Sequence, residues 1–426
     1  MDKRSGSTSF SGMNGSQDIS GRGRGTRRAG LDLLDAFRPR MGARYAANRN
    51  VDAGPGRQTS VSHLSPYIRR RLVTEAEVVA AALDAHGPDG AGKFIQEVIW
   101  RGYFKGWLEH RPSIWESYRS GLVRDLAELQ ENDGLRSRLE AAEGGTSGLE
   151  CFDVWARELT ETGYLHNHAR MWFASIWIFT LRLPWRIGAD FFLRNLVDGD
   201  PASNTLGWRW VAGLHTRGKA YQATASNIAR FTEDRFRLRA SELAAEVVPL
   251  DHEEPGGLPP LRPLREVSAP QARVPTALLI TEEDCGVESF GLSGLDIQAC
   301  ATLAGSELRS DRPVAAAVSA FEQEALDDSV QRSGLDARRL RAAQPPALAD
   351  WATEAGVRQI VTPYVPEGPL RDHLLTQLPV LERRGISLCE LRRDWDRAIW
   401  PHATAGFFKV KKRIPGILRT LEMRCR

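Results

Sequence analysis

Residues 162–210, TGYLHNHARMWFASIWIFTLRLPWRIGADFFLRNLVDGDPASNTLGWRW, decide the fold of this chain. Apolar residues recur there at helical spacing, but acids, amides, histidines and arginines are interspersed among them. Polar side chains at that density inside a core need partners. One interpretation is a polar seam between helices, and the other is a bound polar ligand, which we favour because buried polar networks are usually functional or specific. The stretch contains His166, Asn167, His168, Arg170, Asp198, Asp200, Asn204, Trp172, Trp177, Trp185, Trp208 and Trp210.

The overall composition limits the class of protein. The 426 residues are enough for two or three domains, and a net charge of +3 neither requires nor excludes nucleic acid. Five scattered cysteines without a CxxC pair predict no disulfide framework and no metal site, and indicate a reducing compartment. No apolar run is long enough for a transmembrane helix, and the N-terminus lacks the apolar core of a secretory signal. We therefore expect a cytoplasmic protein without a membrane partner.

Four regions follow from the patterns along the chain. Residues 1–30, rich in Gly, Ser and Arg, are expected to form a disordered arm, and residues 31–247 an all-α domain. Residues 248–275 are rich in proline and predict a linker. In residues 276–426, strands expected at 277–281, 314–319, 359–362 and 386–391 alternate with helices expected at 294–304, 319–333, 346–355 and 369–384, and a basic tail follows. This alternation predicts a smaller, doubly wound α/β domain, without a GxGxxG fingerprint after its first strand.

Two segments of the helical half combine polar and aromatic groups. In EVIWRGYFKGW, Glu97, Trp100 and Arg101 share one helix face; Glu97 and Arg101 form either an ordinary surface pair or part of a site. In TSVSHLSPY, Ser65 is suited to cap a helix that starts with Pro66, and its hydroxyl-rich turn offers donors to a phosphate.

The helical half resembles the flavin-binding domain of the photolyase/cryptochrome family over residues 45–236. EVIWRGYFKGW is similar to the family's E-x-x-W-R-E-F helix, and TGYLHNHARM to T-G-W-M-H-N-R-x-R-M. LVDGDPASNTLGWRW is similar to L-I-D-G-D-x-A-x-N-x-G-G-W-Q-W. The motifs also follow the family's order along the chain.

The resemblance implies an FAD cofactor in the all-α domain. It assigns the pyrophosphate to Tyr45 and the turn at 62–65, with Thr59 and Ser60 as an alternative. It pairs Arg170 with Asp198 beside the flavin ring and places Asn204 opposite flavin N5. The full implied cofactor set is Tyr45, Ser62, His63, Leu64, Ser65, Arg101, Asn167, Arg170, Asp198, Asp200 and Asn204.

The resemblance also implies a substrate, damaged DNA in duplex or single-stranded form. Glu97 matches the carboxyl group that binds a cyclobutane pyrimidine dimer, and Trp100 the aromatic ring on which the dimer stacks. Asn167 stands where (6-4) repair enzymes have a histidine, which favours a cyclobutane lesion; with Glu97, Trp100 and Asn204 it makes up the expected catalytic set. Arg69, Arg70, Arg71 and Lys105 are candidate phosphate contacts, or, for the arginines, a solvated helix face.

The family passes electrons to its flavin along three tryptophans. Trp208 and Trp185 match the first two, but residues 129–142, where the third would fall, contain no tryptophan. Trp177 or Trp172 is the candidate replacement, and either could equally be plain core.

Other departures suggest a divergent branch. The family's Y-F-R-I-F-N-P is here YQATASNI, with Ala223 in place of arginine, and the α/β half follows the helical half instead of preceding it. ADWATEAGVRQIVTPYVPEGP is loosely similar to the family's antenna domain, but it assigns no antenna chromophore. We expect an FAD-dependent, light-driven lyase that repairs cyclobutane dimers. The alternatives are a cryptochrome-like photoreceptor without repair activity and, more distantly, a flavoprotein that serves as an interaction module.

Overall fold

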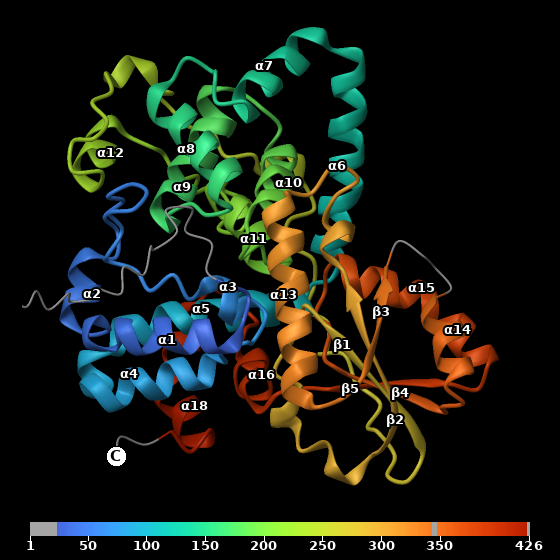
Figure 1. Ribbon diagram of the computed structural model, residues 1–426. Coiled ribbons are helices and arrows are strands. Elements are labelled where there is room, and N and C mark those ends of the chain that lie inside the picture. The colour runs from blue at the N-terminus through green and yellow to red at the C-terminus, as the bar shows by residue number, and fades with distance from the viewer. Residues whose placement is uncertain (1–23, 343–346, 424–426) are drawn as a thin grey trace, which may run out of the picture.

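The computed structural model describes residues 24–342 and 347–423 and shows a helical half beside a smaller α/β half (Figure 1). The helical half contains α1 (Arg27–Phe37), α2 (Ala43–Asn48), α3 (Ser65–Arg69), α4 (Glu75–Gly90), α5 (Gly92–Glu109), α6 (Ser113–Glu131), α7 (Asp133–Glu143), α8 (Glu150–Thr162), α9 (Asn167–Ser175), α10 (Trp185–Asn195), α11 (Pro201–Val211) and α12 (Ala225–Phe231). Short turns of helix are η1 (Arg38–Arg40), η2 (Ile176–Thr180), η3 (Ala240–Glu242) and η4 (Asp251–Glu253). In the described ranges, no helix is long and apolar enough to cross a membrane.

Local signals explain where these helices begin. The Thr74 hydroxyl accepts a hydrogen bond from the Glu77 amide, and the Glu77 carboxylate accepts one from the Thr74 amide, so a reciprocal cap starts α4. Asp200 caps α11 by accepting a hydrogen bond from the Ser203 amide, and Pro201 occupies the first helical position. The loop 196–200 and α11 are thereby fixed relative to each other.

The α/β half is a five-stranded, fully parallel sheet in the order β3-β2-β1-β4-β5, as predicted for a doubly wound domain. Its strands are β1 (Pro275–Thr281), β2 (Asp296–Ala304), β3 (Ala337–Arg341), β4 (Gln359–Pro363) and β5 (Ser387–Leu391). Its helices are α13 (Ala316–Ser333), α14 (Ala347–Glu354) and α15 (Pro369–Arg383), with short turns at η5 (Val287–Phe290), η6 (Leu292–Gly294) and η7 (Ser306–Arg309). In Figure 1, α13 lies between the sheet and the helical half.

Alternation along β1 places the sheet between two cores. Leu278 and Ile280 belong to the large core that continues into the helical half. Ala277 and Leu279 point the opposite way, into a smaller core with residues of α14 and α15. Successive strand residues face opposite sides of a sheet, so the near-continuous apolar run of β1 serves both cores.

Several expected elements differ in the structure. The predicted helix at 294–304 is wrong, because this segment is β2, and the predicted strand at 314–319 instead leads into α13. Strand β3 was missed because three of its five residues are arginines, a composition that hides an edge strand. At the end of the expected all-α domain, between residues 221 and 247, only α12 and η3 form. The first helix begins at Arg27, inside the expected arm, whose residues 1–23 lie outside the described part of the chain.

After β5, the chain returns to the helical half through α16 (Asp394–Ile399), η8 (Trp400–His402), α17 (Phe408–Lys411) and α18 (Ile414–Thr420). Gly106 of α5 is required for this contact, because a Cβ atom there would lie 2.8 Å from the Trp400 Cα atom. This segment, residues 394–420, therefore lies against α5 as part of the helical half.

Candidate functional site

Three elements of the stretch at 162–210 bring its polar residues together with α5. Asn167 and Arg170 lie in the first turn of α9, and Asp198 lies in the loop before α11. Asn204 lies in the first turns of α11. Asn167 is exposed, and Arg170 and Asn204 keep partial exposure, although their helices pack in the core of the helical half. The polar seam therefore opens to solvent.

The predicted pair between Arg170 and Asp198 is present. Arg170 Nη2 lies 3.0 Å from Asp198 Oδ1 and 3.1 Å from Oδ2, and Arg170 Nε donates to the Leu165 carbonyl at 2.8 Å. Burial by itself raises the pKa of Asp198, but the charges of Arg170 and Arg101 lower it below its ordinary value. The pair thus fixes an ionised carboxylate and an oriented guanidinium at the rim of the site.

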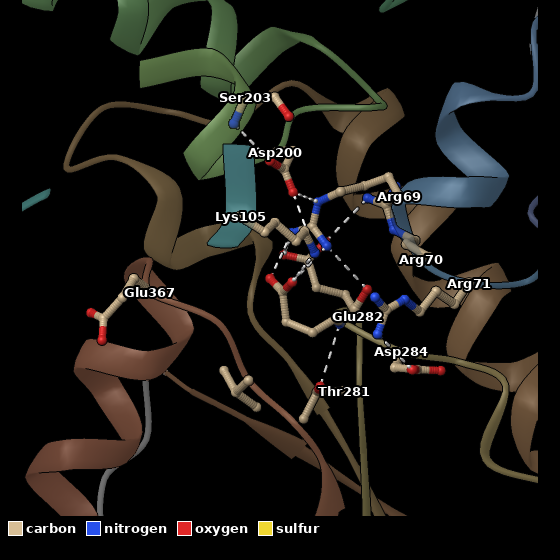
Figure 2. A network of polar contacts seen from close by, with 12 residues as sticks. Arg69, Arg70, Arg71, Lys105, Asp200, Ser203, Thr281, Glu282, Asp284 and Glu367 are labelled. Carbon is tan, nitrogen blue, oxygen red and sulfur yellow. Dashed lines mark hydrogen bonds and ion pairs between the residues drawn. The ribbon is translucent and has the colours of Figure 1, made fainter. Parts of the chain in front are cut away.

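Asp200 is held more deeply. Its carboxylate accepts from the Ser203 amide at 2.8 Å and lies 3.4 Å from Lys105 Nζ and 3.7 Å from Arg69 Nε (Figure 2). Burial opposes ionisation, but Lys105 and Arg69 outweigh it and lower the pKa of Asp200. Asp200 is therefore a fixed negative charge that also caps α11.

The three consecutive arginines at the end of α3 are buried and are not DNA-phosphate contacts, which corrects the prediction made for them. Arg69, Arg70 and Arg71 are only 1%, 0% and 4% exposed. They face three consecutive acids beyond β1, an arrangement we call the charge ladder (Figure 2). Its rungs are Arg69–Glu283 at 2.6 Å, Arg70–Glu282 at 3.2 Å and Arg71–Asp284 at 3.3 Å.

Lys105, the fourth predicted phosphate contact, is also buried, and it lies 3.5 Å from Glu283. The prediction for it is therefore wrong as well. From the sequence alone, a run of arginines is usually interpreted as a solvent-exposed face. Here an acidic run from a distant segment meets the arginines, and the sequence does not show that contact. The ladder joins the α/β half to Asp200 of the candidate site.

The groups around Asn204 fit an aromatic ring system with polar edges. Asn204 Nδ2 donates to the Ala189 carbonyl at 2.8 Å, which fixes the amide and leaves its oxygen for another donor. Arg101 Nη1 is buried without a hydrogen-bond partner in the described chain, and space beside Gly207 is open enough that a Cβ atom there would meet nothing within 4 Å. An orphaned donor and an open face among oriented amides and a guanidinium are what a flavin ring would satisfy.

A cavity of about 180 Å³ lies on the Tyr45 side of the site. Tyr45, Thr59 and Ser60 line it, together with Arg40, Arg44, Arg57 and Glu233, whose carboxylate lies 3.6 Å from Arg57. Hydroxyl groups and several guanidinium groups suit a phosphate or pyrophosphate group. The arginines were not singled out from the sequence, because all three precede the recognised turn and none belongs to a motif.

The turn at 62–65 combines local and site contacts. Ser62 Oγ accepts from the Leu64 amide at 3.3 Å, and Leu64 is fully buried. His63 adopts a positive φ of 54° and has Nε2 at 3.3 Å from the Gln58 carbonyl. The Ser65 hydroxyl hydrogen-bonds to Asp198. Ser65 is thus brought to the Arg170 pair, while Ser62 and Leu64 shape the turn.

Glu97 and Trp100 lie on α5, but in different surroundings. Glu97 pairs with Lys93 at 3.0 Å and Arg49 at 3.4 Å, rather than with Arg101. Trp100 is partly exposed, and one face of its ring stacks on Phe407 from the C-terminal segment, with ring centroids 3.8 Å apart and planes at 13°. Phe407 therefore covers that face of Trp100, and no sequence motif predicted this contact.

The buried tryptophans form two separate routes of aromatic contact. Trp208 contacts Trp177, with ring centroids 6.1 Å apart, and Gly188 gives both rings room. Trp185 contacts Tyr118 at 6.0 Å, and Tyr118 contacts Trp115 at 5.3 Å. Trp177 therefore contacts Trp208, the first predicted position, whereas Trp185, the second, belongs to the other route.

Trp172 and the two histidines of the opening stretch serve other contacts. Trp172 stacks on His168 at 4.1 Å and on Trp155 at 5.5 Å. The ring nitrogens of His166 contact the Arg49 carbonyl and the His168 amide, and burial lowers the pKa of His166 to about 4. His166 and His168 thus anchor the chain at 49–50 and keep the start of α9 in place. In the described ranges, no group of three or more His, Cys, Asp or Glu residues is arranged to hold a metal ion.

Comparisons with known proteins match the helical half. Residues 94–234 match the family model for the FAD binding domain of DNA photolyase. The deoxyribodipyrimidine photo-lyase of Streptomyces griseus is 34% identical over 197 residues, 46% of this chain and 41% of that protein. A deoxyribodipyrimidine photo-lyase of Thermus thermophilus is 34% identical over 194 residues, 45% of this chain and 44% of that protein. The chain therefore spans less than half the length of these relatives.

Two solved structures are also similar over part of the chain. A class III photolyase from Agrobacterium tumefaciens aligns with a TM-score of 0.39 at 26% identity, over 49% of this chain and 43% of that chain. A cryptochrome from Synechocystis sp. PCC6803 aligns with a TM-score of 0.39 at 24% identity and the same coverage.

Residues 94–234, which include the polar groups gathered between α5, α9 and α11, are thus similar to the FAD binding domain of DNA photolyase. The similarity to photolyases is confined to this region, and a parallel α/β half follows it in the chain.

Proposed function

We propose that this protein is an FAD-dependent lyase that repairs cyclobutane pyrimidine dimers in DNA under blue light. The observation that carries the proposal is the opening between α5, α9 and α11. It holds the Arg170–Asp198 pair, the oriented amide of Asn204 and the unpartnered donor of Arg101. The family match and the photo-lyase names of the relatives support the same activity.

Bound FAD would supply light absorption and one-electron transfer at this site. Arg170, Arg101 and Asn204 would hold the ring, with Asp198 and Ser65 keeping Arg170 oriented. The cavity at Tyr45, Thr59 and Ser60 would hold the pyrophosphate, because its three arginines supply the compensating charge. Asn167 and the turn at 62–65 complete the proposed cofactor set.

The proposed lesion site is the part of α5 that carries Glu97 and Trp100. The Glu97 carboxylate can accept a hydrogen bond from the N–H group of a flipped pyrimidine, and Trp100 offers a ring for stacking. Trp208 and Trp185 are the proposed electron carriers, and Trp177, whose ring contacts that of Trp208, is the proposed third.

The second candidate function is a flavin photoreceptor without repair activity. The specific observation in its favour is the Phe407 ring, which covers one face of Trp100. In a repair enzyme, either the other face binds the lesion or Phe407 leaves.

The two functions are separated by illuminating the flavin-loaded protein with an oligonucleotide that contains a thymine dimer and counting dimers by chromatography. We expect dimers to be lost in light. Glu97→Ala should reduce this loss at least tenfold while flavin stays bound, and Glu116→Ala on the exposed face of α6 is the matched control. Bound flavin with no dimer loss would leave the photoreceptor function.

A further inference from the structure

The C-terminal segment is anchored on the helical half by Phe407. This ring is 7% exposed and contacts Tyr103 at 5.5 Å besides its stack on Trp100. Lys409 Nζ donates to the Thr404 hydroxyl at 2.6 Å, which fastens α17 to the turn before it. The segment is thus held at a defined place, with the Phe407 ring facing inward.

Its outward side has an unusual composition. Phe408 is 75% exposed, the highest value among the large apolar side chains of the described residues. Lys409, Lys411, Lys412 and Arg413 are exposed around it, and residues 400–421 contain no acid. None of these four cations forms an ion pair with the described chain, in contrast to the paired arginines of the charge ladder. We call Phe408, Lys409, Lys411, Lys412 and Arg413 the basic-aromatic surface.

Clustered like charges repel one another unless an anion compensates them. An exposed aromatic ring provides a surface on which a nucleic acid base can stack. A polyanion that also presents flat rings fits both properties, and a nucleic acid strand is such a partner. A lipid surface would use the charges and the apolar ring. The position favours DNA, because the surface adjoins Phe407 and through it Trp100, the lesion-stacking residue of the proposed function.

We propose that the basic-aromatic surface binds the DNA strand beside the lesion, with its cations on phosphates and Phe408 against a base. The strand's position relative to Trp100 rests on the proposed function, but the binding of DNA by this surface does not. The helical half would then share its DNA contact with a segment contributed from beyond the α/β half.

The test measures DNA binding in the dark, without any lesion. The full chain, its triple variant Lys409→Glu/Lys411→Glu/Lys412→Glu and Phe408→Ala are titrated against labelled undamaged single-stranded and duplex oligonucleotides at several salt concentrations. We expect the triple variant to bind at least tenfold more weakly. The slope of log K against log salt should fall by about two for the single strand, since three phosphate contacts are lost. Phe408→Ala should weaken single-strand binding about fivefold or more.

The matched control is Arg124→Glu/Arg138→Glu/Lys219→Glu, which makes the same charge change at exposed positions outside the C-terminal segment. This control should lose less affinity for DNA than the triple variant, and Phe408 should still contribute to its single-strand binding. Melting curves verify that each variant is folded, which is expected because every altered side chain is exposed.

Equal loss in the control and the triple variant, unchanged binding in the triple variant, or no DNA binding by the full chain would each overturn the proposal. So would loss of binding to phosphatidylserine vesicles while DNA binding is retained, since the surface would then serve a membrane. The repair assay is independent of these results: a wild-type protein that splits no dimers in light, but loses dark DNA binding in the triple variant, refutes the proposed function alone.

Discussion

Breaking one rung of the charge ladder should destabilise the whole protein. Glu283 accepts from Arg69 Nη2 at 2.6 Å and Nη1 at 2.9 Å, and Lys105 Nζ lies 3.5 Å away. In Glu283→Gln the two cations stay buried without this charge. Removing one partner of a buried pair costs about 3–5 kcal/mol. Because Asp200 and Glu282 remain within 4 Å of Arg69, we expect the lower end, about 3 kcal/mol.

The assay is urea unfolding followed by tryptophan fluorescence, with the free energy of unfolding compared between variants. The control is Glu354→Gln, whose side chain is 71% exposed in its pair with Arg338, and which should change the free energy by less than about 0.5 kcal/mol. A loss below about 1 kcal/mol in Glu283→Gln would refute the idea that the ladder holds the two halves together, because it would mean that water solvates the buried cations readily.

Three further predictions follow from close contacts and burial. Gly106→Ala should cost about 1–3 kcal/mol in urea unfolding and expose the C-terminal segment to limited proteolysis, since the added Cβ meets the backbone of η8; an unchanged midpoint would contradict this. Burial raises the pKa of Glu158 to about 8, so the native state holds its proton and the wild type should lose stability as pH rises from about 4.5 to 8. Glu158→Gln should remove that pH dependence. If the stability of this variant changed with pH as that of the wild type does, the prediction would be wrong. With FAD bound, Trp177→Phe should slow the light-dependent bleaching of oxidised flavin more than Trp172→Phe, because only Trp177 contacts Trp208; equal rates would argue against the route.

The helical half was predictable because its signals are local. Ser65 and Pro66 marked the start of α3, helical spacing marked α5, α9 and α11, and the polar residues of 162–210 were recognised as needing partners. The parallel sheet was also predicted, although β2 was taken for a helix. Its alanines favour a helix in isolation, and burial against neighbouring strands overrides that preference.

The long-range contacts could not be predicted. Arg69 appeared to be a solvated or phosphate-binding residue, since nothing near it in sequence shows that Glu283 lies opposite. Phe407 is far from Trp100 along the chain, so its stack depends on how the C-terminal segment returns to α5. Pairings of this kind are set by the docking of the two halves, and propensity and periodicity say nothing about them.

The central claim is that the opening between α5, α9 and α11 drives dimer repair with light. The measurement that tests it most directly is the number of thymine dimers remaining after the flavin-loaded wild-type protein is incubated with damaged DNA in blue light and, in parallel, in the dark. The account predicts that dimers disappear in light and persist in the dark. Equal dimer counts in both samples, with flavin bound and DNA retained by the protein, would contradict it.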